Sequence, residues 1–239
     1  MKEEKYLAYY DEICVEDKKE VLDICTTASQ VINDRFKIPF DDPKLLGVLF
    51  SKTFEAIIDE LKDAQEKKSS YEINIAKRLS IGYTTTSSEE EEKQGNFMIY
   101  IIHHSSGENH SDIIEDKEDK KPKDLCVQWK DANIVDNTQA ISRISSKTID
   151  KLRKIEVFIG GDDIVIPLFI AIYDSLITIV KELRLAHKDT LEYELNFLSC
   201  FTVIVRENKD GEQEISFEPS IDAKLAIKSD KLATSIHDT

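Results

Sequence analysis

The stretch Tyr193-Glu194-Leu195-Asn196-Phe197 repeats an earlier one, Tyr71-Glu72-Ile73-Asn74-Ile75, which lies 122 positions before it. Each stretch has the alternating pattern of a β-strand and follows a longer helical segment. Paired aspartates, Asp41-Asp42 and Asp162-Asp163, open these two helical segments with an offset of 121 positions, which indicates a one-residue insertion. We interpret the pattern as a tandem duplication of one structural unit.

The apolar residues of the two helical segments are also in register. Both sets follow the spacing i, i+4, i+7, i+8, i+11, which is typical of an amphipathic helix packed on one side. The first set is Phe50, Phe54, Ile57, Ile58 and Leu61, and the second is Ile172, Leu176, Ile179, Val180 and Leu183. Each unit is therefore expected to bury one long helix.

Periodicity and turn signals predict the remaining elements. Asp42 followed by Pro43 is a specific helix start, and Asp210-Gly211 is a strong hairpin signal. The expected helices are 21–35, 43–67, 141–155, 164–187 and 221–232, and the expected strands lie within 71–83, 96–104, 193–206 and 214–217. The predicted divisions are a mixed N-terminal segment (1–18), a first unit (19–104), a charged linker (105–137) and a second unit (138–239).

Composition places the chain among globular proteins. Its 239 residues are 41% hydrophobic and 33% charged, and the net charge of −15 opposes general binding to nucleic acid or anionic membranes. No apolar run approaches the roughly 18–20 uninterrupted residues of a membrane span. The opening Met-Lys-Glu-Glu does not match a signal peptide. Four cysteines without paired spacing, at positions 14, 25, 126 and 200, are interpreted as reduced, mostly buried thiols.

The element order resembles one subunit of the HU/IHF family: two helices, a three-stranded sheet with a protruding hairpin arm, and a short final helix. The second unit carries the resemblance best, in the strand–turn–strand run Glu192–Glu207, the return strand Gly211–Pro219 and Ala223-Lys224-Leu225. The resemblance covers about residues 19–104 and 138–236. It implies an α+β fold of two tandem HU/IHF-like units, which form within one chain the two-subunit body of that family.

The arms depart from the chemistry of that family. HU/IHF arms are rich in Arg and Lys, lie in the minor groove of DNA and carry a Pro wedge at the tip. Here the tip Glu89–Gly95 has four Glu and one Lys, the tip Arg206–Glu214 has four acidic and two basic residues, and neither contains Pro. Arg78-Leu79 and Ser199-Cys200 replace the Gly-rich strand turn. No DNA-contacting residue is carried over, and specific binding of duplex DNA is not expected.

No motif predicts a catalytic, cofactor or metal site. His103 and His104 alternate across a strand and His110 falls in the linker, so a polar strand end is favoured over metal ligation. The acidic residues of 105–123 lack the spacing of a calcium loop. Gly160-Gly161 precede a helix, but the following two aspartates favour a helix cap over an anion site. Cys200 has no paired His motif that would indicate a nucleophile.

The expected function is structural and non-enzymatic. Acidic HU/IHF-like proteins with degenerate arms resemble IHF-subunit-like virion proteins of tailed phages, including crAss-like phages. That resemblance implies a head–tail connector, neck or tail ring component, made in the host cytoplasm and located in the virion. Expected partners are other copies of the chain and neighbouring virion proteins, with no membrane. The expected assembly contacts are Glu89, Glu90, Glu91, Glu92, Phe97, Ile99, Trp129, Lys209 and Asp210.

Other interpretations remain open. The chain fits an acidic regulatory or DNA-mimicking binder of a DNA-binding protein, or a divergent DNA-architectural protein with basic patches outside the arms. Two contact features also have simpler interpretations. The run Glu89–Glu92 fits a solvated hairpin tip, and Trp129 fits an anchor in a small core.

Overall fold

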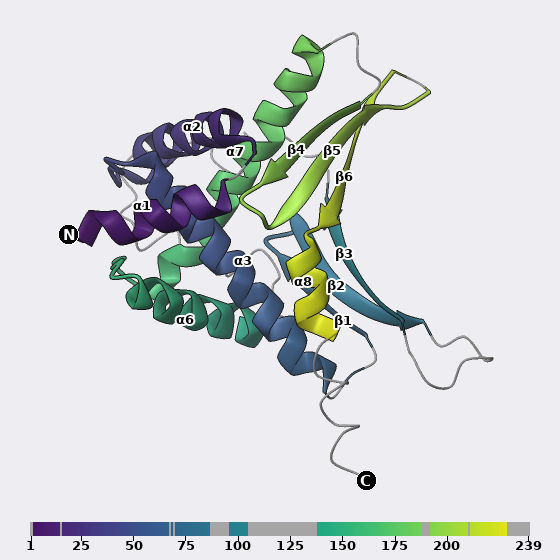
Figure 1. Cartoon of the computed structure of the whole chain (residues 1–239), viewed down its shortest axis with the longest axis horizontal. Helices are drawn as coiled ribbons and strands as arrows, with labels where there is room; N and C mark the ends of the chain where they lie inside the picture. Colours follow the sequence, from purple (N-terminus) through teal and green to yellow (C-terminus); the bar gives the residue numbers. More distant parts are fainter. Residues whose placement is uncertain are drawn as a thin grey trace, which may run out of the picture.

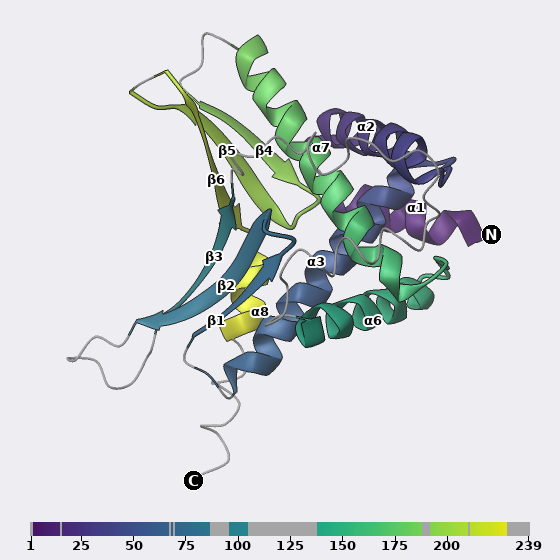
Figure 2. The same cartoon turned by 180° about the vertical axis from the view of Figure 1, so that it is seen from behind.

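The computed structural model describes residues 2–14, 16–66, 68, 70–86, 96–104, 138–187, 192–209 and 211–228. Most helices lie together on one side, and two antiparallel three-stranded sheets lie on the other, so the fold is mixed α+β (Figure 1, Figure 2). The first half contains α1 (Lys2–Ile13), α2 (Lys18–Phe36), α3 (Pro43–Gln65), β1 (Ser70–Ile75), β2 (Leu79–Thr86) and β3 (Asn96–His103). The second half contains α6 (Thr138–Lys154), the 3₁₀ turn η2 (Asp162–Ile164), α7 (Val165–Ala186), β4 (Glu192–Phe197), β5 (Phe201–Glu207), β6 (Gln213–Pro219) and α8 (Ile221–Lys228).

Helices α2 and α3 form where the apolar periodicity predicts them. The side chain of Asp42 caps α3 by accepting a 3.0 Å hydrogen bond from the backbone N–H of Lys44, and Pro43 occupies the first turn. Helix α2 ends at Phe36, and the next residue, Lys37, caps it: Lys37 adopts the left-handed conformation (φ 55°) and donates its N–H to the carbonyl of Asn33. The predicted turn into the second helix is therefore confirmed.

Helix α1 corrects the expectation of a mixed N-terminal segment. The Tyr9 hydroxyl lies 2.9 Å from Ser51 Oγ and donates to Glu55 Oε1 at 2.5 Å, both on α3. The ring of Tyr10 lies against Gly47, where an added Cβ would be only 2.8 Å from the ring. Because glycine permits this close approach, α1 is held by its fit to α3. The apolar periodicity of residues 2–13 alone does not reveal this contact with α3.

The long helix of the second half begins differently from that of the first half. Pro167 lies in its first turn, as expected. The prediction that Asp162 and Asp163 cap this helix is wrong. Both are exposed in η2, and Ile164 occupies the N-cap position without a side-chain hydrogen bond. The one-residue insertion in this turn places the aspartates one residue too early to cap α7.

The first hairpin of each sheet has the same register and the same turn. The closing pairs are Ile75–Leu79 and Phe197–Phe201, which are 122 positions apart. Two non-glycine residues in each turn are left-handed, with φ of 54–55°: Ala76, Lys77, Leu198 and Ser199. Such residues are uncommon, so the two halves share an unusual local structure. The predicted order of strand, turn and strand is confirmed in both halves.

The third strands complete two sheets with the orders β1-β2-β3 and β4-β5-β6. Leu79 pairs with His103 in the first sheet, and its counterpart Phe201 pairs with Pro219 in the second. This register makes β3 and β6 equivalent, with His103 matching Pro219. The third strands were expected from the sequence in both halves.

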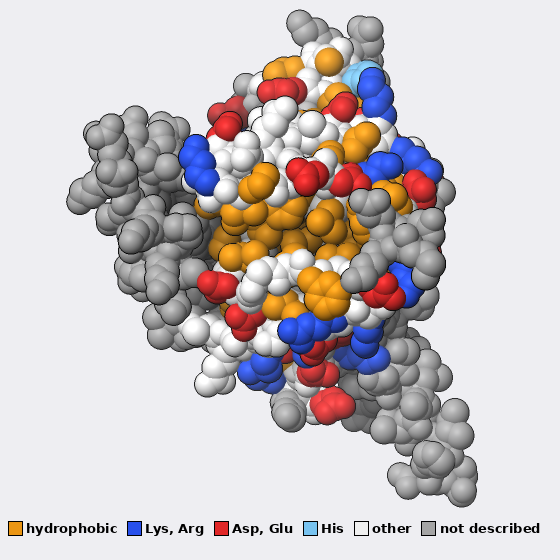
Figure 3. All heavy atoms as spheres, turned by 90° about the vertical axis from the view of Figure 1, so that its left-hand side faces the viewer, with side chains coloured by type: hydrophobic (Ala, Val, Ile, Leu, Met, Phe, Trp, Pro, Cys, Tyr) orange, Lys and Arg blue, Asp and Glu red, His pale blue; other side chains and the backbone are white. Residues whose placement is uncertain are grey.

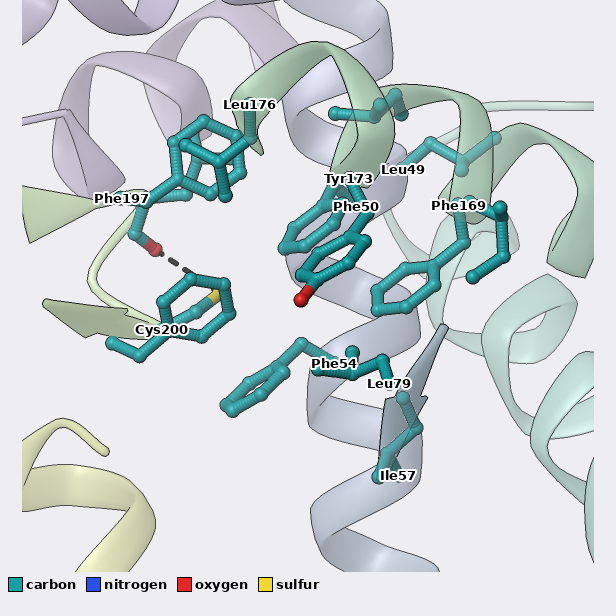
Figure 4. Packing of buried hydrophobic residues seen from close by; sticks show 14 of the residues in the cluster. Leu49, Phe50, Phe54, Ile57, Leu79, Phe169, Tyr173, Leu176, Phe197 and Cys200 are labelled. Carbon is teal, nitrogen blue, oxygen red and sulfur yellow. Dashed lines mark hydrogen bonds between the residues drawn. The ribbon is translucent and has the colours of Figure 1, made fainter. Parts of the chain in front are cut away.

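The core is continuous across both halves. The ring of Phe50 on α3 stacks on Phe169 of α7, with 4.4 Å between centroids, and meets Phe197 of β4 edge-on at 5.0 Å (Figure 4). Phe54 on α3 contacts Phe201 of β5 at 5.4 Å. Helix α6 also packs mainly on α3 rather than on α7. The halves are therefore interlocked, and α3 and α7 cross at the centre of the molecule.

Helix α7 is unusually apolar. Within the described part of the chain, Asp162–Ala186 is the one helical stretch long and apolar enough to cross a membrane, with a mean hydropathy of 2.0. Of that window, 67% is buried inside the protein. The same property is common in core helices, which is the position that α7 occupies here.

Candidate interaction surface

The two sheets turn their outer faces away from the helices and present an open surface. Strands β3 and β6 are in contact, so the sheets adjoin along these two edge strands (Figure 1, Figure 2). Alternation along each strand sends one set of side chains into the core and the other outward. The outward positions whose side chains are described carry five glutamates and one arginine: Glu72, Glu192, Glu194, Glu214, Glu218 and Arg206. This surface is therefore acidic.

Most of that charge lies on the second sheet. Arg206 stands between Glu192 and Glu214 in the strand register. Its Nε donates to Glu192 Oε2 at 2.5 Å, and both side chains are about half exposed, at 54% and 41%. A pair this exposed adds little stability. Glu194 and Glu218 are exposed and have no ion-pair partner among the described residues. The surface is therefore suited to meet cations or a basic partner.

The outer face of the first sheet carries a polar network in place of charges. Ser80, which is fully buried, donates to Glu72 Oε1 at 2.9 Å and lies 2.8 Å from His104 Nε2. Tyr100 donates to Glu72 Oε2 at 3.0 Å, and burial together with this hydrogen bond raises the pKa of Tyr100 to about 12. The carboxylate contacts the serine and not the histidine. This is not the order of a nucleophile, base and orienting acid.

Strand β3 adds exposed apolar side chains beside the acidic surface. Met98 is 56% exposed and Ile102 is 43% exposed. In the repeat register, Met98 is equivalent to Glu214 and Ile102 to Glu218 of β6, and the strands β3 and β6 are in contact. The apolar edge of one sheet therefore adjoins the acidic edge of the other, a combination found at protein contact surfaces.

His103, at the end of β3, and His104, which follows it, point in opposite directions, as expected. His103 Nδ1 lies 2.9 Å from the Tyr173 hydroxyl on α7. Burial, followed by the nearby cations Lys181 and Arg78, lowers the pKa of His103 to about 4. No group of three or more metal-ligating side chains occurs in the part of the chain that the structure describes. His110 lies outside that part.

The described cysteines are buried thiols. Cys14, Cys25 and Cys200 are free and buried, and Cys126 lies outside the described residues. Burial raises the pKa of the Cys200 thiol well above its usual value. A raised pKa disfavours the thiolate that a nucleophile would need. This geometry gives Cys200 a packing role between β5 and α3.

The structure places only some of the expected assembly contacts. Ile99 is 9% exposed and faces the helices, which leaves little of it for a neighbouring chain. Phe97 pairs with Thr85 through the backbone of the β2–β3 ladder. Lys209 is exposed in the β5–β6 turn. The remaining members lie outside the described residues: Glu89, Glu90, Glu91, Glu92, Trp129 and Asp210.

Sequence patterns missed a partly buried ionic contact between α3 and α6. Glu60 is 4% exposed and accepts from Arg143 Nε at 3.0 Å and Nη2 at 2.5 Å, and from Lys147 Nζ at 3.2 Å. Lys151 extends the row by pairing with Asp59 at 2.8 Å. The basic residues recur every four positions on one face of α6. This spacing in the sequence indicates a basic helix face that contacts acidic residues. It does not identify the helix that supplies those acidic residues.

Searches against protein-family models, curated proteins and solved structures found no match for this chain. Function is therefore inferred from the residues and their arrangement. The strongest arrangement is the open sheet surface, with its acidic second half and its apolar strand edge.

Proposed function

We propose that this chain is a non-enzymatic structural protein whose two HU/IHF-like halves form one assembly module. The observation that carries the proposal is the repeated hairpin turn on a shared core: left-handed pairs 122 positions apart, with Phe50 contacting the second half directly. A fused pair of units supplies a rigid body with two sheet surfaces. Such a body is suited to hold neighbouring subunits.

Two observations oppose duplex DNA as the partner. The chain has a net charge of −15, and its open sheet face has five glutamates against one arginine. DNA binding gains most of its affinity from cations that displace counterions of the phosphates. An acidic face loses that contribution. The proposal is therefore a contact with protein.

The more specific role extends the resemblance stated above. We propose a connector, neck or tail ring component of a phage virion, with other copies of the chain and adjacent virion proteins as partners. The exposed Met98 and Ile102 support a protein contact at the sheet edge. The virion setting rests on the likeness to IHF-subunit-like virion proteins.

The proposal is tested with purified protein and with particles. We expect ring or particle association by mass measurement and electron microscopy, and no sub-micromolar binding to a bent or nicked duplex between about 50 and 200 mM salt. Tight duplex binding with a steep salt dependence would refute the structural role. A lone monomer that associates with no virion protein would refute it as well.

A second candidate is an acidic binder of a DNA-binding protein. It is favoured by the four exposed glutamates of the second sheet: Glu192, Glu194, Glu214 and Glu218. Changing these four to Gln should release a basic DNA-binding partner if this role is correct. The matched control changes four exposed glutamates outside the sheets: Glu12, Glu16, Glu66 and Glu182. Equal loss with both sets would indicate only a general charge effect.

A further inference from the structure

The helical side of the molecule carries an apolar area that the sheet surface does not explain. Figure 3 shows hydrophobic side chains gathered at the centre of this side, bordered by charged groups. The turns α2–α3 and α6–α7 both lie on this side (Figure 1). Phe158, in the second turn, is 72% exposed. Half-buried apolar residues accompany it in both turns: Phe36, Ile38, Phe40, Ile155, Ile159 and Ile164.

Contacts from α1 hold the two turns beside each other. The Tyr6 hydroxyl donates to Asp42 Oδ2 at 3.0 Å in the first turn. The ammonium of Lys5 forms an ion pair with Glu156 in the second. Two neighbouring residues of α1 therefore contact the two turns, one turn each. The apolar residues of the turns consequently form one surface, here named the turn surface.

The charge of the turn surface differs from that of the chain. Within residues 34–41 and 153–163, the exposed charged side chains are four basic and four acidic: Arg35, Lys37, Arg153, Lys154, Asp34, Asp41, Asp162 and Asp163. The surface is thus neutral on a chain with a net charge of −15. Two copies repel each other over most of their surface, but here the cations of one copy can face the anions of the other.

We propose that the turn surface is the contact between two copies of this chain, with Phe158 as its central apolar anchor. A twofold contact uses the same patch on both subunits, so the patch must be complementary to itself. Mixed charges around an apolar centre satisfy that condition, whereas the acidic sheet surface does not. The purpose of this contact between copies rests on the proposed assembly function. The sheet surface is then left for a different partner.

The test is the concentration dependence of mass for the full chain, by sedimentation velocity between about 1 and 200 μM, a range that brackets a micromolar contact. We expect wild type to form dimers. Phe158→Ser should raise the dissociation constant by about tenfold or more, as for the loss of a central aromatic anchor. The matched control is Leu185→Ser, because Leu185 is 58% exposed at the far end of α7. It should change the dissociation constant by less than about twofold.

Three outcomes overturn the proposal: a wild type that stays monomeric throughout, equal weakening by both substitutions, or a turn surface covered by the chain itself. Hydrogen exchange of residues 153–163 detects the last case, as protection that is already complete in dilute monomer. Circular dichroism melting is the check that both variants remain folded. Each of these outcomes leaves the proposed function intact if the protein still joins particles, because that function also uses the sheet surface.

Discussion

The two sheets are built to the same register, yet they expose opposite chemistry. Outward positions of β3 hold Met98, Tyr100 and Ile102, and the equivalent positions of β6 hold Glu214, Ser216 and Glu218. Inward positions with described side chains are apolar at Ile99 and Ile101 of β3 and at Ile215, Phe217 and Pro219 of β6. The polar exceptions are His103, which matches Pro219, and Gln213, whose Nε2 donates to the carbonyl of Lys181 on α7. The shared core therefore constrains the inner faces, and the outer faces are free to take different partners.

The long helices show the same contrast. Helix α3 presents Glu60 and Asp59 to the basic face of α6, whereas α7 carries a single acidic or basic residue, Asp174, between Val165 and Val180. Asp174 accepts from Arg78 of the β1–β2 turn, with 3.1 Å between Oδ1 and Nη2. One helix is held to its neighbour partly by charge and the other almost wholly by apolar packing.

The largest expected effect comes from burying a charge in α7. Val180→Asp places a carboxylate at a position with 0% exposure and should cost more than about 4 kcal/mol. Because the core is continuous, the loss should unfold both halves in chemical denaturation followed by circular dichroism. Ile58→Asp on α3 should do the same. Leu185→Asp, at an exposed site of α7, is the control. A variant in which one half stays folded would show that the halves are independent.

A smaller effect is expected at the ionic contact of α3. Arg143→Ala leaves the buried Glu60 with only Lys147, and should lower the free energy of unfolding by about 2–3 kcal/mol. Arg153→Ala on the same helix removes an exposed pair with Asp150 and should change stability by less than about 0.5 kcal/mol. Equal losses in urea titrations would contradict the special role of the buried carboxylate.

The smallest effect is a pH dependence that belongs to the first sheet alone. The folded pKa of His103 is about 4, below its ordinary value near 6.5, so the unfolded chain binds the proton more readily. The contribution of His103 to the free energy of unfolding is fully present above about pH 6.5. It is lost as the pH falls towards 4, and the loss is on the order of 1–2 kcal/mol. His103→Asn should flatten that part of the stability curve, measured by urea titration from pH 7 to 4. An unchanged slope would exclude His103 as the titrating group.

Sequence patterns predicted the elements that local physics controls. The Asp42-Pro43 start, the stripe from Phe50 to Leu61 and the strand turns all appear in the structure. Helix α1 and the pairing of Glu60 with Arg143 were missed, because each depends on a partner far away in the chain. For the candidate surface, Ile99 shows the limit most clearly. An apolar strand residue looks the same in sequence whether its own helices or another chain cover it.

The N-terminal segment has a consequence for how the protein is made. The carboxylate of Asp17 accepts from the backbone N–H of Asn196 at 2.8 Å, and Ser199 donates to the carbonyl of Ile13 at 3.1 Å. These partners leave the ribosome on the order of 10–40 s apart at typical synthesis rates. Until then, the tyrosines of α1 lack part of the body on which they pack. The native state therefore forms late, and the emerging chain must avoid aggregation while its first half waits for the second.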